Sequence, residues 1–151
     1  MSTVAIIMGS ISDMPVMQEA IDILKGFDIE TEVDIVSAHR TPEATHNFVT
    51  DADARGCAAF ICAAGMAAHL AGAVSANTLK PVIGVPINSS LDGLDALLST
   101  VQMPAGIPVA TVAIGKAGAK NAAYLAAQII GTSNQKVHEA LIAERKANAE
   151  A

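Results

Sequence analysis

The chain has 151 residues, of which 52% are hydrophobic and 16% charged, and its formal net charge at pH 7 is −6. This length suits one domain that buries roughly 70% of the surface of its unfolded chain. The acidic balance argues against a nucleic-acid partner, although backbone amides and one or two cations are enough to bind a phosphate. Too few charged residues remain to cover a free monomer, so we expect an oligomer.

Cysteine use and the amino terminus indicate a reduced, cytoplasmic protein. Cys57 and Cys62 have no CxxC partner, and the first residues do not form a signal peptide. The stretch from Gly56 to Val74 has about the length of a membrane span, but its Ala and Gly drive insertion weakly and Gly65 interrupts it. We therefore expect strand, turn and helix there, and no membrane partner.

In chain order, the first half alternates short apolar runs with helical patterns. Thr3–Met8 predicts a strand, and Asp13 is placed to cap the helix that follows. Glu30–Val36 alternates polar and apolar side chains, which is typical of a half-exposed edge strand. A second helix is predicted from Pro42 to about Arg55. This half is therefore expected to form two strand–helix units.

The second half repeats the alternation around more deeply buried strands. Further strands are predicted at residues 58–63, 81–87 and 108–114, with helices through 69–77, over 94–101 and from 115 to about 131. The fully apolar run 58–63 indicates a central parallel strand. Together the units predict an α/β three-layer sandwich with a flavodoxin-like five-stranded parallel sheet in the order 2-1-3-4-5.

The last residues form a charged helical extension. We expect residues 1–131 to be the flavodoxin-like domain and residues 132–151 a helical extension of the same domain. Val137, Leu141 and Ile142 give this extension a narrow apolar stripe. We expect the stripe to pack on a neighbouring subunit.

Residues 37–42 gather three kinds of chemistry at the end of a predicted strand. His39 carries a proton near neutral pH, and Arg40 is a fixed cation suited to phosphate or carboxylate. Thr41 and Pro42 are typical of a helix start. Ligands of doubly wound proteins bind at such links between strand and helix, so we expect His39 to serve an active site.

The turn after the first strand is a candidate phosphate site. Gly9, Ser10 and Ser12 offer amides and hydroxyls at a helix start, which can hold a phosphate. Plain turn and cap chemistry explains the same residues equally well, and the pattern is neither GxGxxG nor a Walker motif. Asp13 either caps the helix or accepts hydrogen bonds from ribose hydroxyls.

Other chemistries lack the residues that they require. No His, Cys, Asp and Glu residues have metal-ligand spacing, so no metal site is expected, and no nucleophile elbow is present. His69 lies in an apolar helix start, where the pattern alone favours a structural histidine. His46 and His138 are expected on the surface. One proton carrier and one cation suit proton transfer on a small phosphorylated substrate without an organic cofactor.

These motifs together resemble the bacterial-type 5-(carboxyamino)imidazole ribonucleotide mutase family of purine biosynthesis. The likeness covers nearly all of residues 3–131 and rests on MGSISD at 8–13, SAHRTP at 37–42, AAHL at 67–70 and the run 101–119. It implies an isomerase that moves a carboxyl group from an exocyclic nitrogen to a ring carbon of an aminoimidazole ribonucleotide, through trapped carbon dioxide. It also implies a homo-octamer with active sites between subunits, and no need for ATP, biotin or metal.

The resemblance assigns roles to the residues of the matched motifs. Ser10, Ser12 and Arg40 are expected to hold the substrate phosphate, and Asp13 the ribose. His39 is expected to be the catalytic acid and base. The imidazole and carboxylate end is expected to be lined by Ser37 and by the segment 64–70, of which we single out Ala64, Gly65, His69 and Leu70.

One position departs from the family pattern. The family has Gly-Ala-Gly-Gly before Ala-Ala-His-Leu, whereas residues 63–66 are here Ala-Ala-Gly-Met. Met66 adds bulk beside the expected pocket, and a methionine does not readily take the positive φ that is open to glycine. Because the other motifs are intact, we expect the variant to be accommodated.

Two alternatives stay open. The first is a carboxylase that uses free carbon dioxide on the same aminoimidazole ribonucleotide; the related animal-type enzyme has Lys where Arg40 stands, which favours the mutase. The second is a non-catalytic flavodoxin-like module. A response-regulator receiver needs an Asp at the end of the third strand, where Ala63 and Ala64 stand here. A flavin carrier needs aromatic walls, and only Tyr124 and three Phe are available.

Overall fold

The computed structural model describes residues 2–151, so residue 1, where the expected domain begins, lies outside the described part. Within residues 2–151 a five-stranded parallel sheet has the order β2-β1-β3-β4-β5, which confirms the predicted topology. The strands are β1 (Thr3–Met8), β2 (Glu30–Ile35), β3 (Ala59–Gly65), β4 (Val82–Ile87) and β5 (Ala110–Thr111).

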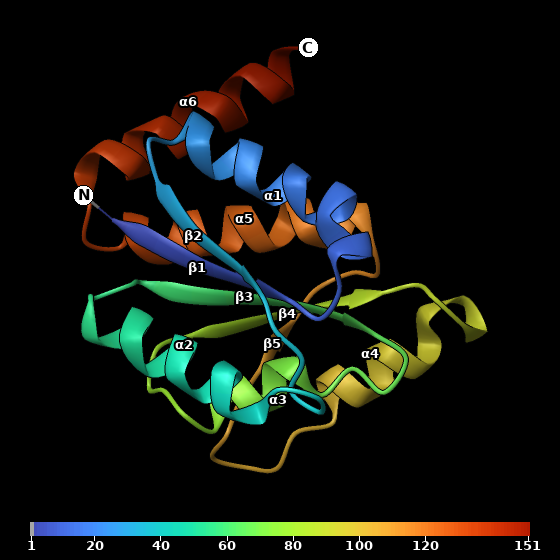
Figure 1. Ribbon diagram of the computed structural model, residues 1–151. Helices are drawn as coiled ribbons and strands as arrows, with labels where there is room; N and C mark the ends of the chain where they lie inside the picture. Colours follow the sequence, from blue (N-terminus) through green and yellow to red (C-terminus); the bar gives the residue numbers. More distant parts are fainter. Residues whose placement is uncertain (1) are drawn as a thin grey trace.

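Helices cover both faces of this sheet, as Figure 1 shows. One face carries α1 (Met14–Gly26) and α5 (Lys116–Gly131), and the other carries α2 (Pro42–Ala54), α3 (Leu70–Ser75) and α4 (Leu94–Val101). Short 3₁₀ turns, η1 (Ile11–Asp13) and η2 (Leu91–Gly93), precede α1 and α4, and α6 (Gln135–Glu150) lies outside the α1 and α5 layer. The three-layer sandwich predicted from the alternating pattern is therefore confirmed.

The central strands are apolar throughout because both of their faces are buried. In β1, Val4 and Ile6 pack toward the α1 and α5 layer, whereas Ala5 and Ile7 pack toward the α2 and α3 layer. All four side chains are fully buried. Because successive side chains of a strand point to opposite faces, β1 contributes to two separate cores, one on each side of the sheet.

Helix α5 approaches the sheet very closely. It contacts the core through a row of fully buried alanines, Ala119, Ala122, Ala123, Ala126 and Ala127. At its first turn, a Cβ on Gly118 would overlap the carbonyl group of Ala113 and lie 2.6 Å from its carbon. Only a residue without a side chain fits there, so the loop that leads into α5 packs directly on the helix backbone.

Strand β5 is much shorter than predicted. The sequence pattern indicated a strand over residues 108–114, but the ladder with β4 includes only Ala110–Thr111. Val112 N–H still donates to the Gly84 carbonyl at 3.1 Å. The next bond of a parallel ladder would come from the N–H of Pro86, which faces the same edge, and proline has none. The regular ladder therefore stops before this proline, although Gly115 N–H still donates to the Pro86 carbonyl at 2.9 Å.

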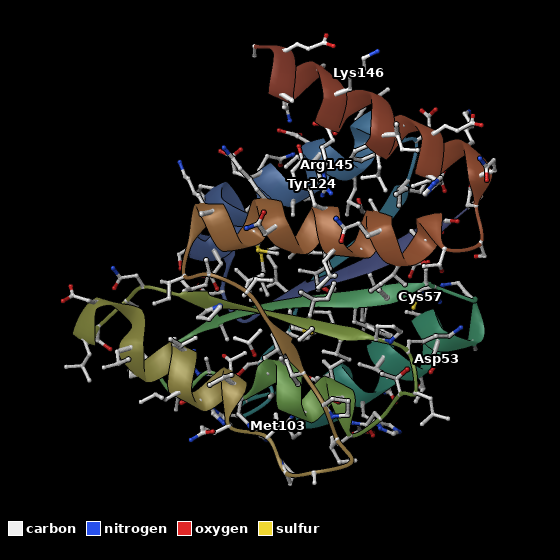
Figure 2. All side chains as sticks on the ribbon, turned by 180° about the vertical axis from the view of Figure 1, so that it is seen from behind. Asp53, Cys57, Met103, Tyr124, Arg145 and Lys146 are labelled. Carbon is white, nitrogen blue, oxygen red and sulfur yellow. The ribbon has the colours of Figure 1, made fainter. Side chains whose placement is uncertain are left out.

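Helix α6 packs on α5 of the same chain. Val137 is buried and Leu141 is partly buried against the α5 side of the core. Tyr124 lies between the two helices (Figure 2), and its hydroxyl donates to Glu144 Oε1 at 2.6 Å. Most of the predicted apolar stripe thus serves an intramolecular contact. Ile142, at 57% exposure, is left outside it, and packing of this extension on a neighbouring subunit stays a prediction.

Within the described chain, no helix is both long enough and apolar enough to cross a bilayer. The apolar stretch 56–74 instead forms β3, a loop and most of α3. The predicted sequence of strand, turn and helix over this stretch is confirmed.

Candidate active site

A cavity of about 450 Å³ lies at the carboxyl ends of the central strands. The strand order reverses between β1 and β3, and this switch point is where doubly wound sheets form a crevice. The lining includes every residue that the sequence singled out for a site: Ser10, Ser12, Asp13, Ser37, His39, Arg40, Ala64, Gly65, His69 and Leu70. Three loops that are far apart in the sequence thus meet around one cavity.

The loop that carries His39 is closed by hydrogen bonds between Ser37 and Thr41. Ser37 N–H donates to Thr41 Oγ1 at 3.0 Å, and the Thr41 hydroxyl donates to the Ser37 carbonyl at 3.0 Å. Arg40 N–H donates to Ser37 Oγ at 3.0 Å. Thr41 occupies the predicted cap position of α2, but its hydroxyl makes no bond to that helix. It holds instead the tight turn on which His39 and Arg40 stand.

The turn after β1 places two hydroxyl groups at the cavity. Ser10 caps η1 by accepting a bond from Ser12 N–H at 3.2 Å, and the two Oγ atoms lie 2.8 Å apart. Gly9 N–H donates to the Ala63 carbonyl at 3.1 Å, which joins this turn to the end of β3. The expected cap chemistry is present, and both serine side chains remain exposed on the cavity.

Asp13 is a buried carboxyl group on the same cavity. It stands at the cap position of α1, yet its side chain makes no capping hydrogen bond, so the predicted capping role is wrong. Only 8% of the residue is exposed. This burial raises the pKa of Asp13 above its ordinary value, partly opposed by a hydrogen bond with the Ser10 backbone. The chain therefore keeps an ionisable group where its charge is costly.

Asp13→Asn should accordingly stabilise the free protein at pH 7. A carboxyl group with a raised folded-state pKa makes folding less favourable as the pH rises through that pKa. The free energy of unfolding at pH 7 should increase by roughly 0.5–1 kcal/mol. The gain should shrink as the pH falls toward 3.8, the ordinary pKa of the group. Urea denaturation across this pH range measures both effects, and a gain that grows at low pH would contradict the assignment.

The cavity lining also includes small or apolar groups: Ala64, Gly65, Ala67, Leu70 and Ile87. Gly65 is needed for space, since a Cβ there would lie 2.7 Å from Ser89 Oγ and 3.3 Å from the Ile87 carbonyl oxygen. Ser89 and Ile87 come from the end of β4 and were not predicted as site residues. The available signal was their place at the end of a central predicted strand.

His69 is not the buried structural histidine that the local residue pattern favoured. It is exposed and lines the cavity, in agreement with the role that the family resemblance implied. Its neighbours Ala68 and Leu70 are the buried residues of this segment. The imidazole packs over Gly72 of α3, where a Cβ would overlap its Cε1 and lie 2.8 Å from its Nδ1, so a glycine there leaves room for the ring.

Met66 takes the backbone conformation that is open to glycine. Its φ is +56°, in the left-handed region that a methionine does not readily take. The residue is 62% exposed and lines the cavity. Ala68 N–H donates to the Met66 carbonyl at 2.8 Å and closes a tight turn there. The fold accommodates methionine by imposing the conformation that glycine would adopt freely.

The two thiols lie away from the cavity. Cys57 precedes β3 at the amino-terminal edge of the sheet (Figure 2), and burial raises its pKa to about 11. Cys62 is buried within β3, and burial also raises its pKa. Among residues 2–151, no three His, Cys, Asp or Glu side chains are grouped as metal ligands.

The reversed sheet order, the cavity at that reversal and its polar loops define a flavodoxin-like α/β protein with a candidate ligand site at the switch point. A model of the AIR carboxylase family matches residues 3–151, and the chain belongs to that family.

Individual relatives agree with this assignment. The N5-carboxyaminoimidazole ribonucleotide mutase of Aliivibrio fischeri is 53% identical over 148 residues, which are 97% of this chain and 92% of that protein. The mutase of Escherichia coli strain K12 is 52% identical over 145 residues, covering 95% and 86%. The crystal structure of Treponema denticola PurE is similar with a TM-score of 0.91 at 32% identity, over 99% of this chain and 93% of that one. The family resemblance drawn from the motifs is confirmed.

Proposed function

We propose that this chain is a mutase that converts 5-(carboxyamino)imidazole ribonucleotide into 4-carboxy-5-aminoimidazole ribonucleotide in purine biosynthesis. The observation that carries the proposal is the meeting of His39, Arg40 and the Ser10–Ser12 hydroxyl pair around one cavity. The Aliivibrio and Escherichia relatives, which share more than half of their aligned residues with the chain, are named as mutases. The residue inventory suits proton transfer on a small phosphorylated substrate, and the names of the relatives support the carboxyl transfer in particular.

The substrate phosphate is assigned to Ser10, Ser12 and Arg40. The serine hydroxyls supply hydrogen bonds, and the guanidinium supplies charge and a fork of N–H donors. Arg40 forms no ion pair with any residue of the described chain, so its charge is available to an anion. Asp13 then accepts hydrogen bonds from the ribose hydroxyls, which would compensate the burial of its carboxylate.

His39 is assigned the proton transfers. As the bond from the exocyclic nitrogen to the carboxyl carbon breaks, that nitrogen keeps the electron pair and takes a proton from His39. The products of this step are aminoimidazole ribonucleotide and carbon dioxide. The ring carbon then forms a bond to the carbon dioxide, and His39 removes the ring proton to restore aromaticity. The net reaction consumes no proton, and each step lies within ordinary acid–base catalysis.

The apolar side of the cavity is assigned to the carbon dioxide. Ala64, Gly65, Ala67 and Leu70 present few polar groups that would hold water beside the reacting carbon. A dry wall protects the intermediate from hydration until the ring attacks it. The steps use the proton donor and acceptor of the chain and require neither ATP, biotin nor metal.

We further propose that the protein is a cytoplasmic homo-octamer whose active sites are completed between subunits. Support comes from an apolar surface stripe at helical spacing on α4, formed by Leu94, Leu98 and Val101 with exposures of 54%, 49% and 44%. The cysteines, both free and buried, agree with a reducing compartment.

Separate supply of the two candidate substrates tests the function. With the N-carboxylated ribonucleotide, the protein should form the ring-carboxylated product without added bicarbonate. With aminoimidazole ribonucleotide and bicarbonate, product formation should be at least about tenfold slower, equivalent to about 1.4 kcal/mol in the barrier. Faster product formation from the second mixture would favour the carboxylase alternative. No product from either mixture would contradict both enzymes.

A further inference from the structure

Ser89 places a hydroxyl group on the cavity beside the residues assigned to carbon dioxide. It is the second residue after β4, and it lines the cavity together with Ile87, the last residue of that strand. Gly65 shows where its side chain lies, because a Cβ built on that glycine would be 2.7 Å from Ser89 Oγ and 3.3 Å from Ser89 Cβ. The serine side chain therefore lies directly against the end of β3.

This hydroxyl differs from the other serine hydroxyls of the cavity. The Oγ atoms of Ser10 and Ser12 lie 2.8 Å apart, and Ser37 Oγ accepts a hydrogen bond from Arg40 N–H. Those three hydroxyls are thus engaged within their own loops. Ser89 is exposed, and its Oγ takes part in none of the side-chain hydrogen bonds of the described chain. Its capacity to donate and to accept is therefore available to a ligand.

The loop that carries Ser89 is held in a defined conformation. Ser90 Oγ donates to Asp95 Oδ2 at 2.5 Å, and Gly93 N–H donates to the Ser90 carbonyl at 2.8 Å. Residues 91–93 all have a positive φ, between +48° and +83°. Such a backbone is costly for residues other than glycine, persists only where the surrounding structure imposes it, and occurs preferentially at ligand sites. The loop therefore keeps Ser89 in place beside β3.

The position of Ser89 indicates which part of the substrate it meets. The phosphate is assigned to the serine pair of the first loop and to Arg40, and the ribose to Asp13. The imidazole and its carboxyl group are expected at the segment that contains Gly65, and Ser89 Oγ is the nearest atom that a side chain on that glycine would meet. A hydroxyl that donates to a carboxylate makes a stronger hydrogen bond than one that donates to a neutral group.

We propose that Ser89 binds the transferred carboxyl group by donating a hydrogen bond to it in the substrate and in the product. The inference rests on the proposed mutase activity, which places that group at this end of the cavity. Carbon dioxide carries no charge, so the same hydroxyl binds the intermediate more weakly than either carboxylate. Ser89 thus contributes to the affinity for both carboxylated ligands, whereas the proton transfers stay with His39.

Two ligands that differ only in the carboxyl group measure this contact. Equilibrium dialysis gives the affinities of Ser89→Ala and of the unmodified protein for 4-carboxy-5-aminoimidazole ribonucleotide and for aminoimidazole ribonucleotide. Ser89→Ala should bind the carboxylated ligand about tenfold more weakly, which corresponds to about 1.4 kcal/mol, and the other ligand within about twofold of the unmodified protein. Conversion between the two carboxylated isomers leaves the comparison valid, because Ser89 is proposed to bind both.

Ser133→Ala is the matched control, because Ser133 is an exposed serine between α5 and α6 that does not line the cavity. It should bind both ligands as the unmodified protein does. An unchanged affinity of Ser89→Ala for the carboxylated ligand, or an equal loss for both ligands, would overturn the contact with the carboxyl group and leave the mutase proposal intact. If the unmodified protein bound neither ribonucleotide, the proposed function and this inference would both be overturned.

Discussion

Replacing His39 with asparagine should lower the turnover number by about 10³-fold, within the range that general acid–base catalysis contributes to enzymatic rates. Asparagine is polar and fits within the space of the imidazole, but it cannot give and take a proton near neutral pH. Both proposed steps need a proton transfer by His39, so both should be slowed in the variant. The rate of ring-carboxylated product at saturating substrate is the measurement.

The structure gives a reason to expect that this variant folds normally. His39 is exposed, and the hydrogen bonds that close its loop run between Ser37, Arg40 and Thr41 without the imidazole. His46→Asn is the matched control, because His46 is an exposed histidine of α2 that does not line the cavity. A His39→Asn protein that kept a substantial share of its turnover would refute the assigned role.

The second large effect concerns stability. Gly118→Ala should reduce the free energy of unfolding by about 3 kcal/mol or more, because the added Cβ would overlap the Ala113 carbonyl group. Neither partner is a flexible side chain, so the first turn of α5 would have to move away from the loop before it. Urea denaturation followed by circular dichroism measures the loss.

Gly26→Ala separates this clash from a general effect of replacing a helical glycine. Gly26 ends α1, and a Cβ there would have no atom within 4 Å. The variant should be more stable by about 0.5 kcal/mol, since alanine has less backbone freedom to lose on folding. Equal unfolding midpoints for the two variants would contradict the close contact between Gly118 and the Ala113 carbonyl group.

The sheet topology followed from the sequence because burial on both faces leaves a clear apolar signal. Residues 58–63 showed it, and the alternation of Glu30–Val36 placed that strand at an edge. The fifth strand was overestimated because its length depends on a partner. Residues 108–114 are as apolar as a strand should be, but the missing N–H belongs to Pro86 on β4. The residue pattern of one strand does not show whether the neighbouring strand can supply the N–H groups that it needs.

The candidate site was predictable where chemistry and position coincide, and not elsewhere. His39 and Arg40 stand out because charged groups at a strand end have few structural uses. Ser89 carries no such signal, and only the closeness of the β3 and β4 ends brings it to the cavity. The apolar neighbours of His69 favoured a structural histidine, because α3 is too short for its helical period to show which side faces outward; only the family resemblance placed His69 at the site. The conformation of Met66 is set by the elements around it rather than by methionine.

The alanine row of α5 gives this molecule one rigid side. A methyl group has no torsion to adjust, so the contact between α5 and the sheet cannot repack through side-chain rotation as contacts of leucine or methionine can. A larger residue at any of these positions must displace the whole helix, and α6 with it. Substitutions that change the shape of the strand ends without unfolding the protein should therefore be found on the α2, α3 and α4 face. The α5 face should keep its packing when such substitutions occur.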